Sequence, residues 1–340
     1  MRLDGPALDA IAVETRETLL VDVLRRQIAF MRGAVPFWRE RLANVAFDEG
    51  QIEKIRDLAR YPIFSKDELR AIRPAALLPN EHVAELSMCR WTSGTTGRPT
   101  VNFWTETDWA AAAASVARML GRQAPAQAPR VFNGYSQAHL TGSLYHDALR
   151  RLGGVVFDRS HHAEEVFSML AQTELFDFDT LVLPERTTSG KAIGLADVLG
   201  EDPTFLTRHG VQWWIGSSGT FSPATVKAVH RDGVASVSNL YGSSEFGMFA
   251  ISCARTPGDF HVAQGHVLVE IVDGSGSPVD NGRAGSIVVT HLSGMDRDGS
   301  AQTYLGSQLL RLAVGDAATF VSDVCTCGLT TPRLRAISRL

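Results

Sequence analysis

The chain has 340 residues, of which 44% are hydrophobic, enough to bury a substantial core in one large domain or two ordinary ones. Its formal net charge is −4 at pH 7, and the charges are interspersed rather than gathered in an acidic tail or a basic stripe. Because a nucleic-acid-binding surface needs clustered basic residues, this pattern argues against a nucleic-acid partner. No stretch approaches the about 20 apolar residues that cross a bilayer, so we expect no membrane partner.

The N-terminal residues are too polar for the hydrophobic region of a signal peptide. We therefore expect a cytoplasmic protein. Four cysteines are too few to staple a chain of this size, and a reducing cytosol disfavours structural disulfides. Their spacing is more informative than their number.

The expected elements begin with helices. Apolar residues recur at helical spacing from Leu8 to Ala43, which predicts a helical N-terminal region. Ser65, followed by Glu68 three residues later, predicts a capping box at the start of another helix. Beyond residue 85, short apolar runs alternate with longer amphipathic ones. The expected strands are 131–133, 154–157, 180–183, 211–215 and 236–241, and the helices between them include 144–152 and 223–229.

Alternating strands and helices are typical of a parallel sheet covered on both faces. From His266 onward the pattern changes to strand, Gly/Ser/Pro turn and strand, which predicts antiparallel pairing. The expected fold class is α/β, with mainly parallel sheets, flanking helices and a C-terminal antiparallel β-subdomain. The expected division is a helical segment over 1–85 packed on the core, an α/β core over 86–264 and a β-subdomain over 265–340.

The strongest local motif is a loop rich in glycine and hydroxyl groups, Thr92 to Thr100. Gly94 and Gly97 allow tight turns, and the hydroxyls and amides around them are suited to phosphate oxygens. The loop is not a Walker A motif, because the glycine spacing differs and no Lys precedes a terminal Ser or Thr. An ordinary solvent loop is the alternative.

Two acidic residues follow strand-like segments. Glu245, in Tyr-Gly-Ser-Ser-Glu-Phe-Gly, falls at the end of a predicted strand, where α/β proteins bind ligands, and its carboxylate suits Mg²⁺. Asp316 ends the segment Arg-Leu-Ala-Val-Gly-Asp and could grip two ribose hydroxyls. A solvated carboxylate is the alternative for Glu245, and a simple Asx turn is the alternative for Asp316.

In this order and at these separations, the three segments closely resemble the motifs of the adenylate-forming superfamily, and within it those of the phenylacetate-CoA ligase branch. The resemblance covers nearly the whole chain, including residues 35–42, which are similar to the branch's N-terminal helix. It implies ATP-dependent activation of a carboxylic acid, aromatic by preference, to an acyl-adenylate with release of pyrophosphate. Thioester formation with CoA or a carrier protein could follow.

The resemblance also implies roles for individual residues. Glu245 would hold Mg²⁺ and act in catalysis together with the hydroxyls of the loop, namely Thr92, Ser93, Thr95 and Thr96. Asp316 would bind the ribose. The β- and γ-phosphates would be held by the loop residues Ser93, Gly94, Thr95, Thr96 and Gly97. The adenine would be lined by Gly216, Ser217, Ser218, Tyr241 and Gly242. The expected nucleotide-binding set also includes Ser243, Ser244 and Arg311.

The expected acid pocket comprises Tyr135, His139, Trp214 and Gly242. His139 could orient the carboxylate or be a structural histidine, and Trp214 could equally be a core residue.

The branch also includes members with a zinc site, and the spacing of Cys253, His261, Cys325 and Cys327 fits such a site. Three thiolates and one imidazole would form a closed tetrahedral structural centre. The alternative is three reduced, unligated cysteines. Cys89 lies outside this set and is expected in the core.

Relatives in the branch continue into a mobile lid domain that carries a lysine, whereas this chain stops at residue 340. We therefore expect the lid to be absent, either because the sequence is truncated or because the enzyme works without it. Two alternatives stay open: a nucleotide- or acyl-binding partner subunit without turnover of its own, and an enzyme that passes the adenylate to an amine or another non-thiol acceptor. The oligomeric state is also open, with a dimer as one candidate.

Overall fold

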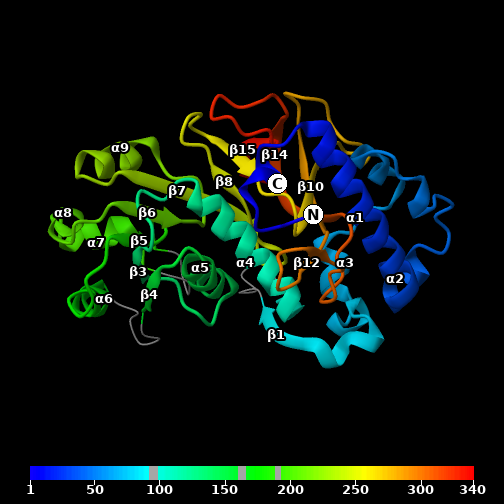
Figure 1. Cartoon of the computed structure of the whole chain (residues 1–340), viewed down its shortest axis with the longest axis horizontal. Coiled ribbons are helices and arrows are strands. Elements are labelled where there is room, and N and C mark those ends of the chain that lie inside the picture. The colour runs from blue at the N-terminus through cyan, green and yellow to red at the C-terminus, as the bar shows by residue number, and fades with distance from the viewer. Residues whose placement is uncertain (92–98, 160–165, 188–192) are drawn as a thin grey trace. The chain divides into compact units, whose positions relative to one another are not determined.

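The computed structural model describes residues 1–91, 99–159, 166–187 and 193–340 (Figure 1). The contacts divide the chain into two units. Unit 1 comprises Met1–Ser115 and His261–Leu340, and unit 2 comprises Val116–Phe260. The expected N-terminal segment and the whole of the expected β-subdomain therefore belong to the same unit, although they lie at opposite ends of the sequence.

The N-terminal part of unit 1 is helical, as predicted. Along the first long helix, Val21, Leu24, Ile28 and Met31 form a buried apolar stripe. The capping box is confirmed as well, since the Ser65 hydroxyl accepts a hydrogen bond from the Glu68 N–H while the Glu68 carboxylate accepts one from the Ser65 N–H. The elements are η1 (Pro6–Asp9), α1 (Val13–Ala34), α2 (Pro36–Arg41), η2 (Glu49–Gln51), η3 (Ile55–Arg60), α3 (Lys66–Ala71), η4 (Pro74–Leu77) and η5 (Asn80–Glu85).

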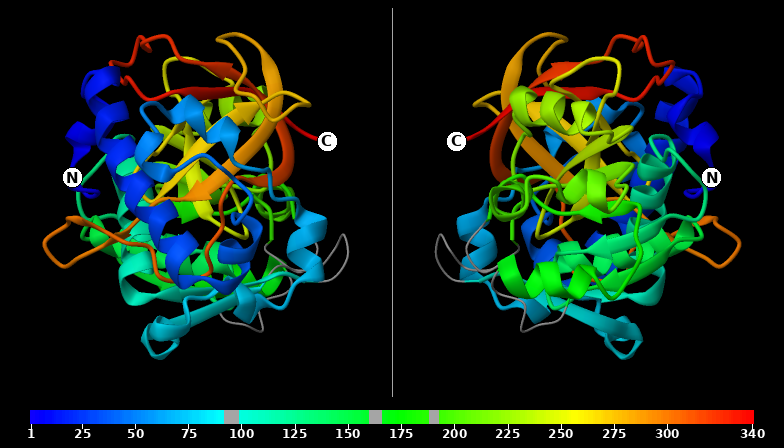
Figure 2. Two further views of the ribbon diagram at one scale, coloured as in Figure 1. Left: turned by 90° about the vertical axis from the view of Figure 1, so that its right-hand side faces the viewer. Right: turned by 90° about the vertical axis from the view of Figure 1, so that its left-hand side faces the viewer.

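The strands of unit 1 are antiparallel. A two-stranded pair joins β1 (Leu86–Trp91) to β2 (Val101–Thr105). The C-terminal strands, coloured yellow-orange to red in Figure 2, pair in the order β10–β11–β14–β15, which confirms the predicted antiparallel β-subdomain. Their bounds are β10 (Val267–Val272), β11 (Ala284–His291), β14 (Leu312–Val321) and β15 (Arg333–Arg339), and a short pair is formed by β12 (Gly294–Met295) and β13 (Ala301–Gln302).

Unit 2 is the α/β part. Its strands follow the order β8–β7–β6–β5–β3–β4, and every neighbouring pair is parallel except β7 and β8. Each expected strand of this region is present, with ends shifted by a residue or two. The strands are β3 (Arg130–Asn133), β4 (Val155–Asp158), β5 (Thr180–Val182), β6 (Trp213–Gly216), β7 (Ser236–Ser243) and β8 (Gly247–Ser252).

Helices separate the parallel strands of unit 2, as the alternating pattern predicts (Figure 1). They are α5 (Leu140–Arg151), α6 (Val166–Thr173), α7 (Leu195–Glu201), α8 (Phe205–Arg208) and α9 (Pro223–Arg231). The chain passes from unit 1 to unit 2 through α4 (Glu106–Gly121) and returns through β9 (Asp259–Val262). Across the described ranges, no helix has the length and apolarity needed to span a membrane.

A buried carboxylate organises part of unit 1. Asp108 is 1% exposed, and its oxygens accept hydrogen bonds from the N–H groups of Thr105, Leu305 and Gly306 at 3.0, 3.0 and 2.8 Å. Gly306 is required there, because a Cβ atom at this position would lie 2.2 Å from the Phe103 carbonyl oxygen. Asp108 thus ties the start of α4 to the segment that precedes β14.

We expect Asp108→Asn to lower the free energy of unfolding by about 1–3 kcal/mol, because the amide nitrogen would face backbone N–H groups that now donate to an acceptor. Denaturant unfolding measures this change. The matched control is Glu106→Gln on the exposed first turn of the same helix, which should cost under about 1 kcal/mol. Equal losses of unfolding free energy in the two variants would show that the hydrogen bonds of Asp108 do not tie α4 to the segment before β14.

Candidate functional site

The predicted phosphate loop falls largely on residues 92–98, outside the described residues, so Thr92, Ser93, Gly94, Thr95, Thr96 and Gly97 stay predictions. Both flanks are described. Trp91 ends β1 and is paired with Val101 at the start of β2. The predicted loop is therefore the connection between two antiparallel strands of unit 1, and Thr100 at its end is buried.

In unit 2, the residues predicted for adenine lie on two neighbouring parallel strands. Gly216 ends β6 and is paired with Asn239 of β7, which continues to Tyr241 and Gly242. Because the strands are parallel, their carboxyl ends share one edge of the sheet, where α/β proteins bind ligands. Sequence-distant residues, 216–218 and 241–244, are thereby brought to the same edge.

Close backbone approach makes glycine necessary at both strand ends. A Cβ atom on Gly216 would lie 2.1 Å from the Leu183 carbonyl oxygen. One on Gly242 would lie 2.1 Å from the Gly247 carbonyl oxygen. Any side chain at these positions would push the backbone out of place, so the two glycines allow the tight packing of this edge.

The turn after β6 is held from two sides. Ser218 has φ +78°, an uncommon value for a residue other than glycine. On one side the hydroxyl of Tyr135 is hydrogen-bonded to Ser217, and on the other the Asn239 Nδ2 donates to the Gly219 carbonyl oxygen at 3.0 Å. The Asn239 side chain is 4% exposed, and its Oδ1 has no hydrogen-bond partner among the described residues.

Asn239 was missed by the sequence analysis. Its signal was available, because it lies two residues before Tyr241 on the same predicted strand and therefore on the same face. A buried acceptor left without a donor is costly, and a ligand that donates a hydrogen bond removes this cost. The arrangement therefore suits a ligand with an amino or amide N–H.

Glu245 lies in the connection between β7 and β8 and is 1% exposed. Of its neighbours, Ser243 ends β7 and Ser244 is exposed. Tyr241 makes an edge-to-face contact with Phe249 at 5.3 Å between ring centroids. The carboxylate oxygens of Glu245 are the kind of ligand that Mg²⁺ prefers.

The residues predicted for an acid pocket have different environments. Tyr135 is 3% exposed, and His139 is the partly exposed residue that precedes α5. Trp214 is fully buried: its ring stacks on Phe221 at 4.0 Å between centroids, and its Nε1 donates to the Leu183 carbonyl oxygen. The indole thus lies in the hydrophobic core of unit 2.

In unit 1, Asp316 is paired across β14 and β15 with Arg339. The Asp316 carboxylate lies 3.3 Å from the Arg339 guanidinium, and the two side chains are 12% and 78% exposed. Arg339 is a second residue that the sequence analysis missed, because only the register of β15 places it opposite Asp316. The pair offers a carboxylate and an exposed cation at one point.

Three of the predicted metal ligands lie together in unit 1. The possible ligand atoms of His261, Cys325 and Cys327 are within 4.8 Å of one another, and the Cys327 Sγ lies 3.3 Å from the His261 Nε2. The His261 Nδ1 is hydrogen-bonded to the Thr331 hydroxyl at 3.1 Å, and burial lowers the pKa of the imidazole. A neutral imidazole whose other nitrogen is held by a neighbour is the usual form of a metal-binding histidine.

The fourth predicted ligand, Cys253, is buried in unit 2, at the start of the connection from β8 to β9. Its N–H donates to the Asp259 carbonyl oxygen at 2.8 Å, which closes this connection as a hairpin. His261 follows Asp259 by two residues on the same short strand.

Comparison with known proteins adds a second kind of observation. No family model matches the chain. Two curated relatives, from Thermus thermophilus and Pseudomonas putida, are named phenylacetate-coenzyme A ligase and are 29% and 28% identical over 98% and 84% of this chain. The matched regions make up 72% and 66% of those two relatives, so the chain spans about two thirds of the length of the second one.

Solved structures show the same fold. A 2-hydroxyisobutyryl-CoA ligase in complex with 2-HIB-AMP and CoA has a TM-score of 0.81 at 19% identity, covering 97% of this chain and 76% of that one. The N-terminal subdomain of Klebsiella oxytoca NpsA has a TM-score of 0.51 at 14% identity, covering 73% and 62%. Over most of its length the chain is thus similar to curated phenylacetate-coenzyme A ligases, and it shares the fold of a solved CoA ligase.

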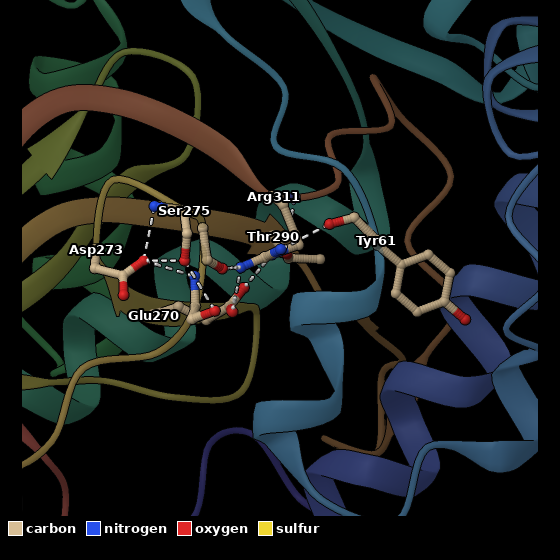
Figure 3. A network of polar contacts seen from close by, with 8 residues as sticks. Tyr61, Glu270, Asp273, Ser275, Thr290 and Arg311 are labelled. Atoms are coloured by element: carbon tan, nitrogen blue, oxygen red, sulfur yellow. Dashed lines mark hydrogen bonds and ion pairs between the residues drawn. The ribbon is translucent and has the colours of Figure 1, made fainter.

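The predicted nucleotide contact Arg311 has a different environment from the one expected (Figure 3). Its guanidinium is 1% exposed and pairs with both carboxylate oxygens of Glu270 at 3.1 and 3.0 Å. It also donates to the carbonyl oxygens of Tyr61 and Gly276, each at 2.7 Å. Four donor contacts thus go to protein acceptors, and Arg311 is better placed to hold β14, which carries Asp316, than to bind a nucleotide.

The turn that contains Gly276, one of the acceptors of Arg311, is held by the side chain of Asp273. The Asp273 carboxylate accepts hydrogen bonds from the N–H groups of Ser275 and Ser277 at 2.8 and 3.0 Å (Figure 3). Gly276, with φ +83°, then directs its carbonyl oxygen to Arg311. The turn, the ion pair and β14 therefore form one connected network.

We expect Glu270→Gln to destabilise the protein by about 3–5 kcal/mol, because it leaves the buried Arg311 charge without its counter-ion. Thermal or denaturant unfolding measures the loss. Asp67→Asn, which removes the exposed Asp67–Arg70 pair, should change stability by no more than about 1 kcal/mol. A loss for Glu270→Gln as small as that of the control would show that the buried pair does not hold β14.

Proposed function

We propose that this chain binds ATP and a carboxylic acid and joins them as an acyl-adenylate with release of pyrophosphate. The observation that carries the proposal is the carboxyl edge of β6 and β7, where a constrained turn, two obligatory glycines and the buried acceptor of Asn239 meet. An adenine ring fits this edge, because its exocyclic amine supplies the donor that Asn239 Oδ1 needs.

For the nucleotide, we assign each part of the binding to its own segment. In unit 2, Gly216, Ser217, Ser218, Tyr241 and Gly242 would surround the adenine, and Glu245 would hold Mg²⁺. In unit 1, the Asp316 carboxylate would accept hydrogen bonds from the ribose hydroxyls beside the Arg339 cation. The segment Thr92–Gly97, with its hydroxyls and amides, would hold the β- and γ-phosphates.

In the reaction, a carboxylate oxygen of the acid attacks the α-phosphorus of ATP, and the bond from that phosphorus to the bridging oxygen of pyrophosphate breaks. No side-chain nucleophile is needed, so catalysis consists of positioning and of stabilising the charge that develops on the phosphates. Mg²⁺, when bound, supplies much of that charge neutralisation. The role of Glu245 is to fix where the cation sits.

The relatives define the substrates to test first. The curated relatives are named for phenylacetate and coenzyme A, and the 2-hydroxyisobutyryl-CoA ligase structure holds both an acyl-AMP and CoA. We propose an aromatic acid as substrate and CoA as acceptor, with a carrier protein as the alternative acceptor. His139 and Tyr135 would lie by the acid, Tyr135 through its ring.

We also propose a structural Zn²⁺ held by His261, Cys325, Cys327 and Cys253. Three thiolates and a neutral imidazole are a donor set typical of closed tetrahedral zinc sites. Chain connectivity supports Cys253 as the fourth ligand, since its partner Asp259 is only two residues from His261. Bound zinc would fix the loop between β14 and β15 to β9.

Exchange of labelled pyrophosphate into ATP tests the proposed reaction. We expect the wild-type protein to catalyse exchange only when an aryl acid is present. In Asp316→Ala we expect the KM for ATP to rise about tenfold or more, with a smaller change in kcat, because hydrogen bonds to a charged group are lost. Asp280→Ala, at an exposed position of the same unit, is the control and should leave KM unchanged. Absence of exchange across a broad panel of aryl and alkyl acids would overturn the proposal.

Metal analysis of the purified protein tests the zinc site. We expect about one zinc per chain, and a loss of both metal and thermal stability in Cys327→Ser, because structural zinc binding contributes directly to folding. Cys89→Ser is the matched control, since Cys89 is exposed and lies outside the group. Wild-type protein that binds no zinc when it is supplied would refute the site.

A further inference from the structure

The hydroxyl of Tyr135 makes three contacts with a single residue of the turn after β6. It donates to the Ser217 carbonyl oxygen at 3.0 Å, accepts from the Ser217 N–H at 3.0 Å and accepts from the Ser217 hydroxyl at 3.2 Å. Tyr135 comes from the connection between β3 and α5, 82 residues away in sequence. Both residues are buried, with exposures of 3%.

These contacts use the full hydrogen-bonding capacity of a phenol, which has one donor and two acceptor positions. Burial raises the pKa of Tyr135 to about 12, so the hydroxyl keeps its proton at any working pH and donates it to the Ser217 carbonyl oxygen. The hydroxyl therefore has no donor left for the carboxylate of an acid substrate. Only the ring of Tyr135 is available to line a pocket.

The turn that Tyr135 holds is not stable by local geometry alone. Ser218 has a positive φ, which costs a residue with a Cβ atom free energy unless its surroundings impose the conformation. The backbone of its two flanking residues is hydrogen-bonded by side chains, Ser217 by Tyr135 and Gly219 by Asn239. Asn239 acts from the same sheet edge, whereas Tyr135 reaches the turn from the segment predicted to contact the acid.

We propose that Tyr135 is a positioning residue that sets the adenine-binding turn and links it to the connection between β3 and α5, which carries the predicted acid-pocket residues Tyr135 and His139. Nucleotide affinity would then depend on a hydroxyl that touches neither the nucleotide nor the acid. This inference rests on the proposed function, because it takes the turn at 216–218 as the adenine site. It assigns to Tyr135 a role in ATP binding rather than in recognition of the carboxylate.

The neighbouring Tyr145 offers a matched control. Its ring lies 5.4 Å from that of Tyr135, and it is fully buried. Its hydroxyl lies near the Ser217 side chain but makes no hydrogen bond with the backbone of the turn among the described residues. Tyr145→Phe therefore alters the same aromatic cluster and keeps the hydrogen bonds of Tyr135 with the Ser217 N–H and carbonyl oxygen.

Calorimetric titration with AMP, together with steady-state kinetics in ATP, tests the proposal. In Tyr135→Phe the buried N–H and carbonyl of Ser217 lose their partner, so we expect AMP affinity to fall and the KM for ATP to rise by about tenfold, with the KM for the acid changing less. Tyr145→Phe should keep both nucleotide constants within about twofold of wild type. Thermal melts of both variants establish that each is folded.

The outcomes separate this proposal from the proposed function. If wild-type protein binds no adenine nucleotide, the proposed function fails. If wild type binds AMP and Tyr135→Phe binds it equally well, the positioning role is wrong while the proposed function stands. If Tyr135→Phe changes only the KM for the acid, the positioning role is wrong, and the hydroxyl recognises the carboxylate of the acid instead.

Discussion

Parallel pairing of β6 and β7 is the constraint on which the candidate site of unit 2 depends. The pairing of Gly216 with Asn239 places the turn after β6 beside the segment that leads to Tyr241 and Glu245. Both strand ends also approach other backbone so closely that only glycine fits at Gly216 and Gly242. The carboxyl edge of parallel strands is where α/β proteins usually bind nucleotides.

Buried polar side chains then fix the segments that the sheets leave irregular. Asp108 accepts hydrogen bonds from three backbone N–H groups. Arg311 donates to a carboxylate and to two carbonyl oxygens. The hydroxyl of Tyr135 makes all of its hydrogen bonds with Ser217. In each case the polar group is away from water, so losing a partner costs far more than it would at the surface. Such contacts hold loops in single conformations, which a preorganised binding site requires.

The β14–β15 hairpin carries two candidate sites at opposite ends. Cys325 and Cys327 lie in the connection between the strands, and the pair of Asp316 and Arg339 lies at the open end. Between these ends β15 contains an extra residue, since β14 advances from 317 to 319 while β15 retreats from 338 to 335. Ala336, with φ +53°, lies in this bulge. The bulge is what allows Arg339, rather than its neighbour, to face Asp316.

Much of this fold can be predicted from the sequence. The alternation of short apolar runs with amphipathic segments, the Ser65 capping box and the change of pattern at His266 predicted the strands, the helices and the antiparallel C-terminal end correctly. Strands buried on both faces give short apolar runs, and helices buried on one face give amphipathic segments. The order and spacing of the motifs around Glu245 and Asp316 carried much of the resemblance to the adenylate-forming superfamily. The positions of Asn239, Arg339 and the Ser217 partner of Tyr135 were decided only by tertiary structure. Each depends on strand register or on contacts between segments far apart in sequence, and no local pattern records which hydrogen-bond partner a buried polar group finds.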